Sequence, residues 1–390
     1  MANRLPGTPR LLRALNDRAA LELLLSRGPL TRAQLGELTG LSKVTASQLV
    51  ERLEERGLVT RVGEQAGGRG PNAQLYAVTP GSAHVVGVEV AADRVVAACA
   101  DITGDVIGRV EQSTKDTDDP VGVVHNAVVR AASSAQAQLA SVRRVVLGTP
   151  GLVDPSTGDI TFAFNLPRWH RGLLAALRED LHTPVVFEND VNLAAVAEAH
   201  IGAAAGVDDF VLVWCDTGVG LAIMLDGRLH HGSAGAAGEI GYLPVPGAPI
   251  PRDTSKRAKP PFGRLAGAEA LRAVAREHGF RGSSAADAIR SAIASGTAGG
   301  PVLDEIARRL ALGVASTCVV LDPPLVVLAG AVGQAGGTAL AERVQHEVAA
   351  ITLVSPAVVV TQVEDEPVLR GALRRALDAV RDEVFGSTVA

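Results

Sequence analysis

One short stretch of the chain holds side chains that suit contact with the edges of nucleic-acid bases. Gln48 can form two hydrogen bonds to adenine, and Lys43 and Arg52 can reach guanine or a phosphate group. Val44 and Thr45 can contact the methyl group of thymine. Base contacts of this kind require one element that presents these side chains together to a groove of the duplex.

The apolar spacing in the same stretch predicts this element as a helix over Lys43–Arg56, with Ser42 as its N-cap and Gly57 after its end. Four residues at positions i, i+3, i+4 and i+7 should form its buried face: Ala46, Leu49, Val50 and Leu53. The candidate DNA-contacting residues on its start, outer face and flanks are then Ser42, Lys43, Val44, Thr45, Ser47, Gln48 and Arg52.

Two further helical patterns precede this helix. The first covers residues 9–26 and is stopped by Gly28-Pro29. The second is short: Thr31 and Gln34 fit a capping box at its start, and Gly40 suits its C-terminal cap. Two short helices joined by a tight turn that contains glycine are typical of a helix-turn-helix.

A wing is predicted after the third helix. Strand patterns over residues 58–62 and 75–78 flank a tip at residues 63–72 that is rich in glycine. Arg69 stands between two glycines in this tip, so no neighbouring side chain would block its entry into a narrow minor groove. The alternative is a pair of helices with a β-hairpin that serves protein contacts.

The charge distribution favours a polyanion at the N-terminus. Residues 1–80 carry 11 Lys and Arg and 7 Asp and Glu, whereas the remaining residues carry 26 and 35. The three cysteines, Cys99, Cys215 and Cys318, are far apart in apolar runs, which predicts small buried side chains. No uninterrupted apolar run is long enough to span a membrane, so we expect a soluble cytoplasmic protein with no membrane partner.

Strand and turn patterns repeat in the rest of the chain. Val85–Ala100 and residues 105–110 suggest an antiparallel hairpin, followed by a helix over 120–139 and a strand over 142–147. The second half repeats strands and glycine turns at 210–225 and 325–333. This repetition predicts two similar α/β lobes, with a ligand where strand ends meet a crevice.

Five motifs in one order identify a family resemblance: Ser42–Ser47, Gly67–Pro71, Asn165–Trp169, Glu188–Asn192 and Ala237–Gly241. The chain resembles the ROK family of repressors and sugar kinases. The resemblance implies an α/β fold with an N-terminal winged helix-turn-helix (1–80) and a two-lobed, actin-like (ribonuclease H-like) domain. Its first lobe would cover 81–200 and its second lobe 201–390, with the C-terminal helix returning to the first lobe.

The resemblance also predicts that kinase activity has been lost. Kinases of the family carry Asp-x-Gly-Gly-Thr in the first strand pair, where this chain has Ala91 and Ala92 for the glycines and Asp93 for the threonine. Alanine methyl groups crowd a phosphate-binding turn, and an Asp repels phosphate. Asp216 also replaces a glycine in the second phosphate turn. Asp190 matches the catalytic base of these kinases, so here it would be a vestigial base that only accepts a hydrogen bond from a sugar. We expect the protein to use no cofactor.

The resemblance implies a zinc site in most family members, but this sequence lacks the residues that would bind the metal. Tyr242 stands at the position of the zinc-binding His, and residues 246–265 contain no cysteine. His230-His231 suggests a pair of surface histidines, because adjacent residues on a strand point to opposite faces. We therefore expect no metal.

The residues that remain for a ligand rich in hydroxyl groups are amides, carboxylates and a phenol. Asn189 and Asp190 would also suit the cap of the helix that follows them, and the two roles are compatible. Glu269 is a candidate for a second ligand carboxylate. The predicted ligand residues are Gly151 (through its backbone), Asn165, Asn189, Asp190, Glu239 and Tyr242.

These inferences favour a sequence-specific DNA-binding transcriptional regulator, a repressor by expectation, that senses a sugar or sugar derivative without phosphorylating it. Its partners would be a double-stranded DNA operator and a second copy of the chain in a homodimer or higher homo-oligomer. Two alternatives stay open. One is an ATP-dependent sugar kinase with a DNA-binding head, and the other is a non-enzymatic protein-interaction module.

Overall fold

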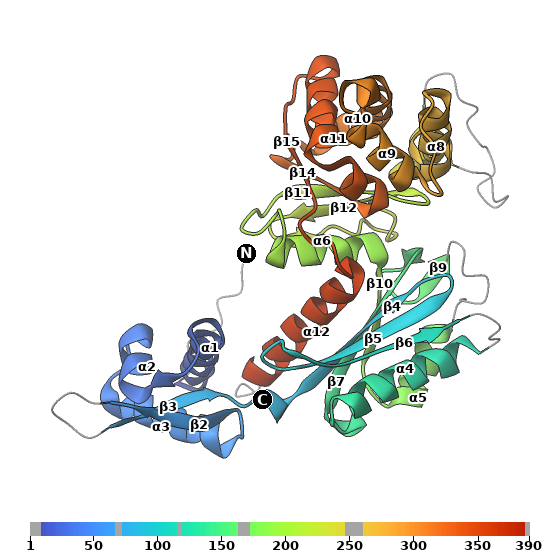
Figure 1. Ribbon diagram of the computed structural model, residues 1–390. Helices are drawn as coiled ribbons and strands as arrows, with labels where there is room; N and C mark the ends of the chain where they lie inside the picture. The colour runs from blue at the N-terminus through green and yellow to red at the C-terminus, as the bar shows by residue number, and fades with distance from the viewer. Residues whose placement is uncertain (1–8, 67–71, 115–118, 163–171, 246–259, 387–390) are drawn as a thin grey trace. The chain divides into compact units, whose positions relative to one another are not determined.

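The computed structural model describes residues 9–66, 72–114, 119–162, 172–245 and 260–386 (Figure 1). The chain forms two compact units. The first consists of Met1–Leu147, Ala175–Val186 and Ala372–Ala390. The second consists of Gly148–Leu174 and Phe187–Gly371. The sequence predicts boundaries at residues 80 and 200 and a C-terminal helix that returns to the first lobe. In the structure, segments of the two units alternate along the chain, and Ala372–Ala390 belongs to the first unit.

Three helices and three short strands form a winged helix, called the head, at the start of the first unit. In chain order they are α1 (Pro9–Arg27), β1 (Leu30–Thr31), α2 (Arg32–Thr39), α3 (Lys43–Glu55), β2 (Val59–Gln65) and β3 (Ala73–Val78). The capping box of Thr31 and Gln34, the left-handed Gly40 and the Ser42 cap are all confirmed. The sequence does not predict β1, which pairs with β3, because two residues are too few to show a period.

An ion pair lies within the core of the head. The buried face of α3 consists of the predicted residues Ala46, Leu49, Val50 and Leu53. Asp17 of α1 is also buried, with 0% of its surface exposed. Arg52 Nη2 and Nε donate to the two carboxylate oxygens of Asp17 at 2.5 and 3.2 Å. Arg56 Nη1 also lies 3.7 Å from Asp17 Oδ2. Because a buried carboxylate without a partner is strongly destabilising, Arg52 is the main residue that stabilises Asp17.

The head is joined to the C-terminal helix α12 (Pro367–Gly386) inside the first unit. Arg56, the C-cap residue of α3, donates from Nη2 to the backbone oxygen of Val384 at 2.9 Å. Arg18 Nη2 of α1 lies 2.7 Å from the carboxylate of Asp382. Both α1 and α3 therefore contact the last two turns of α12.

A five-stranded sheet follows the head, in the order β10-β7-β4-β5-β6. Its strands are β4 (His84–Val90), β5 (Arg94–Asp101), β6 (Val106–Ser113), β7 (Val142–Thr149) and β10 (Val185–Asn189). The apolar run Val85–Ala100 supplies both β4 and β5, with a reversal at residues 91–93. The helices that accompany this sheet in the chain are α4 (Pro120–Ser134) and α5 (Leu173–Leu181). Helix α4 packs so closely on β6 that a Cβ on Gly108 would overlap the backbone oxygen of Ala131.

The second unit contains a second sheet in the order β13-β12-β11-β14-β15. Its strands are β11 (Phe210–Cys215), β12 (Val219–Leu225), β13 (Arg228–Leu229), β14 (Leu325–Ala329) and β15 (Ala357–Val360). Numbered within each sheet, both sheets have the strand order 5-4-1-2-3. The expected α/β fold with two similar lobes is therefore confirmed. A small hairpin of β8 (Leu152–Val153) and β9 (Ile160–Phe162) precedes this sheet in the chain.

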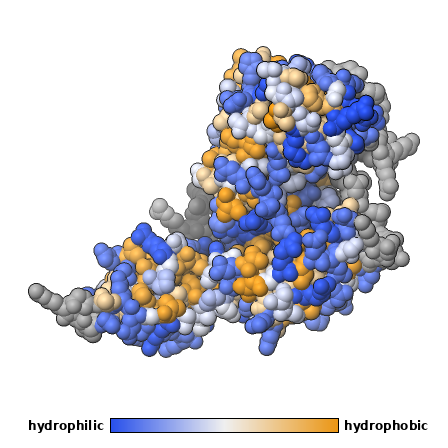
Figure 2. Space-filling view, in the orientation of Figure 1, coloured by the Kyte–Doolittle hydropathy of each residue, from blue (hydrophilic) through white to orange (hydrophobic). Residues whose placement is uncertain are grey.

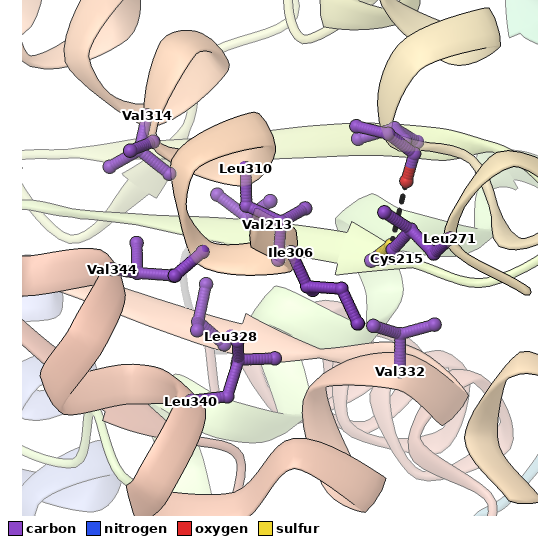
Figure 3. Close-up of a cluster of buried hydrophobic side chains, with 14 of the residues drawn as sticks. Val213, Cys215, Leu271, Ile306, Leu310, Val314, Leu328, Val332, Leu340 and Val344 are labelled. Atoms are coloured by element: carbon purple, nitrogen blue, oxygen red, sulfur yellow. Dashed lines mark hydrogen bonds between the residues drawn. The ribbon is translucent and has the colours of Figure 1, made fainter. Parts of the chain in front are cut away.

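Helices cover both faces of the second sheet. One face packs against α7 (Pro261–Ala266), α8 (Ala268–Glu277), α9 (Ala285–Ala294), α10 (Gly300–Leu321) and α11 (Gly330–Ile351). The other face packs against α6 (Asp190–Ile201). In Figure 3, Val213 and Leu328 of the sheet meet Ile306 and Leu310 of α10 and Val344 of α11. Aliphatic side chains thus make most of this core, as the 3% aromatic content implies.

The most apolar segments of the chain are buried in the cores around the two sheets. Within the described ranges, no helix combines the length and the apolar character needed to cross a membrane. Cys99, Cys215 and Cys318 are all buried free thiols, as predicted. Cys215 donates from Sγ to the backbone oxygen of Ala266 at 3.3 Å, which ties β11 to α7.

Helix α12 contains residues of both units. Its first residues belong to the second unit, where a Cβ on Gly371 would overlap the backbone oxygen of Leu193 in α6. From Ala372 onward it belongs to the first unit, where Arg381 donates to the carbonyl groups of Ile102 and Thr103 at 2.8–3.0 Å. The absence of a side chain at Gly371 is thus what allows α12 to approach α6.

We predict that Gly371→Ala strongly destabilises the protein, because the added methyl group cannot fit between α12 and the backbone of α6. The expected loss is about 2 kcal/mol or more in the free energy of unfolding, measured by urea denaturation. Gly386→Ala, in the same helix but with open space around its Cα, is the matched control and should change little. Equal stabilities of the two variants would contradict the close packing.

Candidate DNA-binding surface and ligand site

The side of α3 away from the core of the head is open to solvent. At its start and over its first two turns the exposed residues are Ser42, Lys43, Val44, Thr45 and Gln48, and Ser47 is half-buried. Val44 is 68% exposed although it is apolar, which suits contact with a base methyl group. Ser42 Oγ accepts a hydrogen bond from Thr45 N at 3.2 Å and so fixes the first turn of the helix. We refer to these six residues as the α3 surface.

The structure corrects the expectation that Arg52 points outward. Its side chain is 31% exposed, and its guanidinium group forms two hydrogen bonds to Asp17. Its Nη1 also donates to the backbone oxygen of Gln48 at 3.3 Å. The sequence could not show this pairing because Asp17 lies 35 residues away in the chain. Arg52 therefore stabilises the head and is not part of the α3 surface.

The two strands of the predicted wing are present. Strands β2 and β3 pair antiparallel, with Val59 opposite Val78. Arg61 on β2 lies 2.8 Å from Glu54 of α3, which fixes the wing against this helix. Arg69, the residue expected to enter the minor groove, lies outside the described residues.

In the second unit, Asn189 positions the start of α6. Its Oδ1 accepts hydrogen bonds from Val191 N at 2.9 Å and Asn192 N at 3.2 Å, so it is the N-cap that the sequence predicts. Its Nδ2 donates to the backbone oxygen of Gly151 at 3.0 Å, and Gly151 has a positive φ of 134°. Two of the predicted ligand residues, Asn189 and Gly151, are thus in direct contact, and Asn189 holds the Gly151 loop beside α6.

Three carboxylates of the second unit influence one another. Burial raises the pKa of Asp190 to about 6, and the negative charge of Asp216 raises it further. Burial also raises the pKa of Glu239, with a second contribution from the charge of Asp190, and burial raises the pKa of Asp216. Desolvated carboxylates that repel one another favour hydrogen-bond donors from a ligand, and hydroxyl groups are such donors.

A glycine lets Glu239 reach this group. Gly238 has a φ of +100°, and a Cβ there would overlap the backbone oxygen of Leu221. Leu221 N donates to the Gly238 oxygen at 3.0 Å. The loop before Glu239 is therefore packed directly on β12.

The sequence does not reveal that a buried glutamate, Glu188, pairs with a histidine beside Asp190. Glu188 is 3% exposed, and its Oε2 lies 2.9 Å from Nε2 of His231. Its Oε1 accepts from Asn192 Nδ2 at 2.9 Å and from Asn189 N at 3.1 Å. The pair orients the residues on both sides of Asp190.

The expectation of two surface histidines holds for only one of them. His230 is exposed, whereas His231 is half-buried against Glu188, so the expectation is wrong for His231. Its carboxylate partner lies 43 residues away in the chain, where no local pattern marks it.

Tyr242 is influenced by the charge of Glu239. It ends the short 3-10 helix Ile240–Tyr242, and burial followed by the charge of Glu239 raises the pKa of its hydroxyl. Glu269 stands in the first turn of α8, next to Ala268, whose N–H donates to the backbone oxygen of Asp216 at 3.1 Å. Asn165 lies outside the described residues.

The residues present do not fit the zinc site of the family. A phenol stands where an imidazole ligand would be needed, and all three thiols lie in apolar cores. Desolvation raises the pKa of Cys215 to about 12, which opposes the thiolate form that zinc requires.

The turn between β4 and β5 contains Ala91, Ala92 and Asp93, the residues that the family resemblance aligns with the phosphate motif of the kinases. Ala91 N donates to the oxygen of Arg94 at 2.9 Å, which closes the turn. The backbone oxygens of Ala92 and Asp93 accept hydrogen bonds from Thr114, from Oγ1 at 3.2 Å and from N at 3.0 Å. The turn therefore presents the methyl group of Ala92 and the carboxylate of Asp93, both exposed, at its tip.

We compared the sequence with models of known protein families, and the result agrees with the two similar sheets described above. The model described as the ROK family matches residues 85–378. The chain belongs to the ROK family. A second model, described as the MarR family, matches residues 15–70, a range that falls within the head. A winged helix joined to a ROK domain with an actin-like fold is thus the architecture of this ROK protein.

Named relatives include regulators. The DNA-binding transcriptional dual regulator NagC of Escherichia coli K12 is 28% identical over 243 residues, 61% of this chain and 59% of that protein. The xylose repressor of Bacillus subtilis 168 is 26% identical over 244 residues, 60% and 61% of the two chains. The match spans about three-fifths of these regulators. A solved ROK family transcriptional regulator, a homologue of E. coli MLC, superposes with a TM-score of 0.76 at 18% identity, covering 97% of this chain and 99% of that one.

We predict that Arg52→Ala lowers stability, whereas Lys43→Ala lowers DNA affinity. Removal of Arg52 leaves the buried Asp17 carboxylate without its main partner, which should cost about 2–4 kcal/mol in the free energy of unfolding. Lys43 is exposed, so its removal should leave thermal unfolding unchanged and weaken DNA binding. Normal stability with lost DNA binding in Arg52→Ala would instead indicate a direct DNA contact.

A pH prediction follows from Asp190. Its pKa is raised to about 6, so ionisation disfavours the folded state, and the free energy of unfolding should rise as the pH falls from 7 through that value. Asp190→Asn should remove the part of this dependence that Asp190 contributes, leaving that of Asp216 and Glu239, and stabilise the protein at pH 8 by roughly 1–3 kcal/mol. Asp226→Asn, at an exposed turn, is the control and should keep the wild-type pH profile. If the free energy of unfolding of Asp190→Asn depended on pH as that of the wild type does, the raised pKa of Asp190 would be contradicted.

Proposed function

We propose that this ROK protein is a sequence-specific transcriptional repressor whose ROK domain binds a sugar without phosphorylating it. The observation that carries the proposal is the α3 surface, an exposed set of base-reading side chains on a winged helix that is joined to α12 of the ROK domain. The relatives NagC and the xylose repressor are named as regulators, which supports the same function.

The α3 surface suits the major groove of an operator. Gln48 would pair with adenine, Lys43 would reach guanine or phosphate, and Val44 and Thr45 would contact a thymine methyl group. Arg69 of the wing would add a minor-groove contact. A winged helix reads one half-site, so we propose a homodimer on a palindromic operator in the cytoplasm.

An exposed apolar patch on the head supports a second copy as partner. Leu12 and Leu15 of α1 are 56% and 54% exposed, and Figure 2 shows apolar residues gathered on the head. Apolar side chains gathered on one helix face gain free energy when another surface covers them.

The proposed effector is a neutral sugar that lies against Asp190, Asn189 and Glu239. Sugar hydroxyl groups would donate to the mutually repelling carboxylates and so stabilise their ionised forms. The Gly151 backbone and Tyr242 would add to the polar lining, together with Asn165. Binding should then weaken as the pH falls through about 6, because protonated Asp190 no longer accepts two such bonds.

Helix α12 offers a route from this site to the head. Gly371 of α12 contacts the backbone of α6, which begins at Asp190, and Val384 of α12 contacts Arg56 of the head. Sugar binding that shifts α6 would therefore act on the head through one continuous helix. We propose that this shift lowers the affinity for the operator, because the two heads of the dimer lose their spacing.

The absence of phosphoryl transfer in this proposal is supported by the β4–β5 turn. The exposed Ala92 methyl group and Asp93 carboxylate occupy the place where kinases of the family have glycine and threonine. A carboxylate repels ATP, and the methyl groups keep phosphate from the backbone. No metal or cofactor is needed for the proposed function.

One observation favours the sugar kinase alternative. A carboxylate with a pKa of about 6 is well suited to act as a general base, and Asp190 stands at the catalytic-base position of the family. A coupled ADP-release assay with ATP, Mg²⁺ and a panel of sugars tests it. Sugar-dependent turnover that Asp190→Asn abolishes would establish the kinase.

The test of the repressor is fluorescence anisotropy with DNA from upstream of the gene, across a salt series. We expect sequence-dependent binding that a sugar releases, with D-xylose, N-acetylglucosamine and glucose as the first probes. Gln48→Ala should weaken specific binding by about tenfold or more, whereas Glu55→Gln, at the other end of α3, should stay within about twofold. Equal affinity for all DNA sequences in both variants would refute specific recognition by α3.

A further inference from the structure

A pocket of about 330 Å³ lies at the end of α8 in the second unit. It is lined by Arg272, Arg276, Phe280, Arg281 and Gly282. None of these residues belongs to the α3 surface or to the carboxylate site. Three of the five residues are arginines, so the pocket is strongly cationic although the whole chain has a net charge of −5.

The pocket exists because α8 ends in a Schellman turn. Gly279 has a φ of +85°, and its N–H donates to the Arg276 oxygen at 3.0 Å. The N–H of Phe280 donates to the Ala275 oxygen at 2.8 Å. This reversal packs Phe280 on the apolar core and brings Arg281 back towards the last turn of α8. The side chains of Arg276 and Arg281 both stay exposed.

The three guanidinium groups have no partner among the residues that the structure describes. Within the described part of the chain, Arg272, Arg276 and Arg281 make no side-chain hydrogen bond or ion pair. Arginines on the neighbouring helices α9, α10 and α11 do pair with carboxylates, at 2.6–2.8 Å in the cases of Arg290, Arg309 and Arg343. The pocket therefore differs from these neighbours in having cations whose charge no described carboxylate neutralises.

Helix electrostatics explain only part of this cluster. A cation in the last turn of a helix is stabilised by the helix dipole, which favours Arg276 at the end of α8. Arg272 stands four residues earlier on the same face, where two like charges repel each other. Arg281 lies beyond the end of the helix. A bound anion would remove the mutual repulsion of all three.

We propose that this pocket binds the phosphate group of a small phosphorylated molecule. The planar guanidinium group donates two parallel hydrogen bonds to phosphate, and an arginine cluster is suited to a dianion. The volume of about 330 Å³ is at the small end of the range for ligand sites. Phe280 gives the pocket an apolar wall for the carbon skeleton of the ligand.

The test is isothermal titration calorimetry of the full chain with inorganic phosphate, glucose 6-phosphate and glucose. We expect both phosphates to bind and the binding to weaken with salt. Arg276→Gln and Arg281→Gln should each weaken it by about tenfold or more, because each removes a charge-assisted hydrogen bond. Glucose carries no phosphate, so any heat that it gives belongs to the carboxylate site and should be the same in these variants. Arg228→Gln, an exposed arginine on β13 of the same unit, is the matched control and should bind phosphate as the wild type does.

Three outcomes would overturn the proposal. The first is no binding of either phosphate at millimolar concentration. The second is equal weakening by Arg228→Gln, which would indicate a general charge effect. The third is loss of non-specific DNA binding, with no change in phosphate binding, in the Arg276 and Arg281 variants, which would assign the cluster to the DNA backbone. Because all the variants are at exposed positions, unchanged circular dichroism is expected throughout.

Discussion

The rest of the structure depends on one helix that contains residues of both units. Helix α12 has 20 residues, which corresponds to a length of about 30 Å. Its start is fixed by the backbone contact between Gly371 and Leu193, and its end by Arg381 and by Arg56 of the head. One helix thus supplies packing contacts to both units.

The carboxylates of the candidate ligand site are held in an environment that disfavours their ionised form. Asp190, Asp216 and Glu239 are desolvated carboxylates, and the charges of Asp216 and Asp190 raise the pKa values of their neighbours. The fold maintains this arrangement with neutral supports, such as the bond from Asn189 to Gly151. Desolvated carboxylates therefore cost stability at this candidate site, a cost that is common where polar groups are positioned for binding before a ligand arrives.

Local features of the fold could be predicted from the sequence, and long-range pairings could not. The caps Thr31, Gly40 and Ser42 depend on residues within four positions, so their patterns are visible in one stretch. Arg52 and His231 pair with carboxylates 35 and 43 residues away, and nothing local marks either partner. Alternation also fails in strands β4 and β5, because both are buried on both faces. The candidate site was predicted through family motifs, whereas its supports were found only in three dimensions.

The buried thiols make the protein convenient for labelling. Burial raises the pKa of Cys99 and Cys318 to about 11 and that of Cys215 to about 12, so at neutral pH none offers an accessible thiolate to an alkylating dye. A cysteine placed at an exposed position of the head and another on the second unit would then be the only reactive ones. The native chain thus already provides the unreactive background that distance measurements by fluorescence or spin labels require.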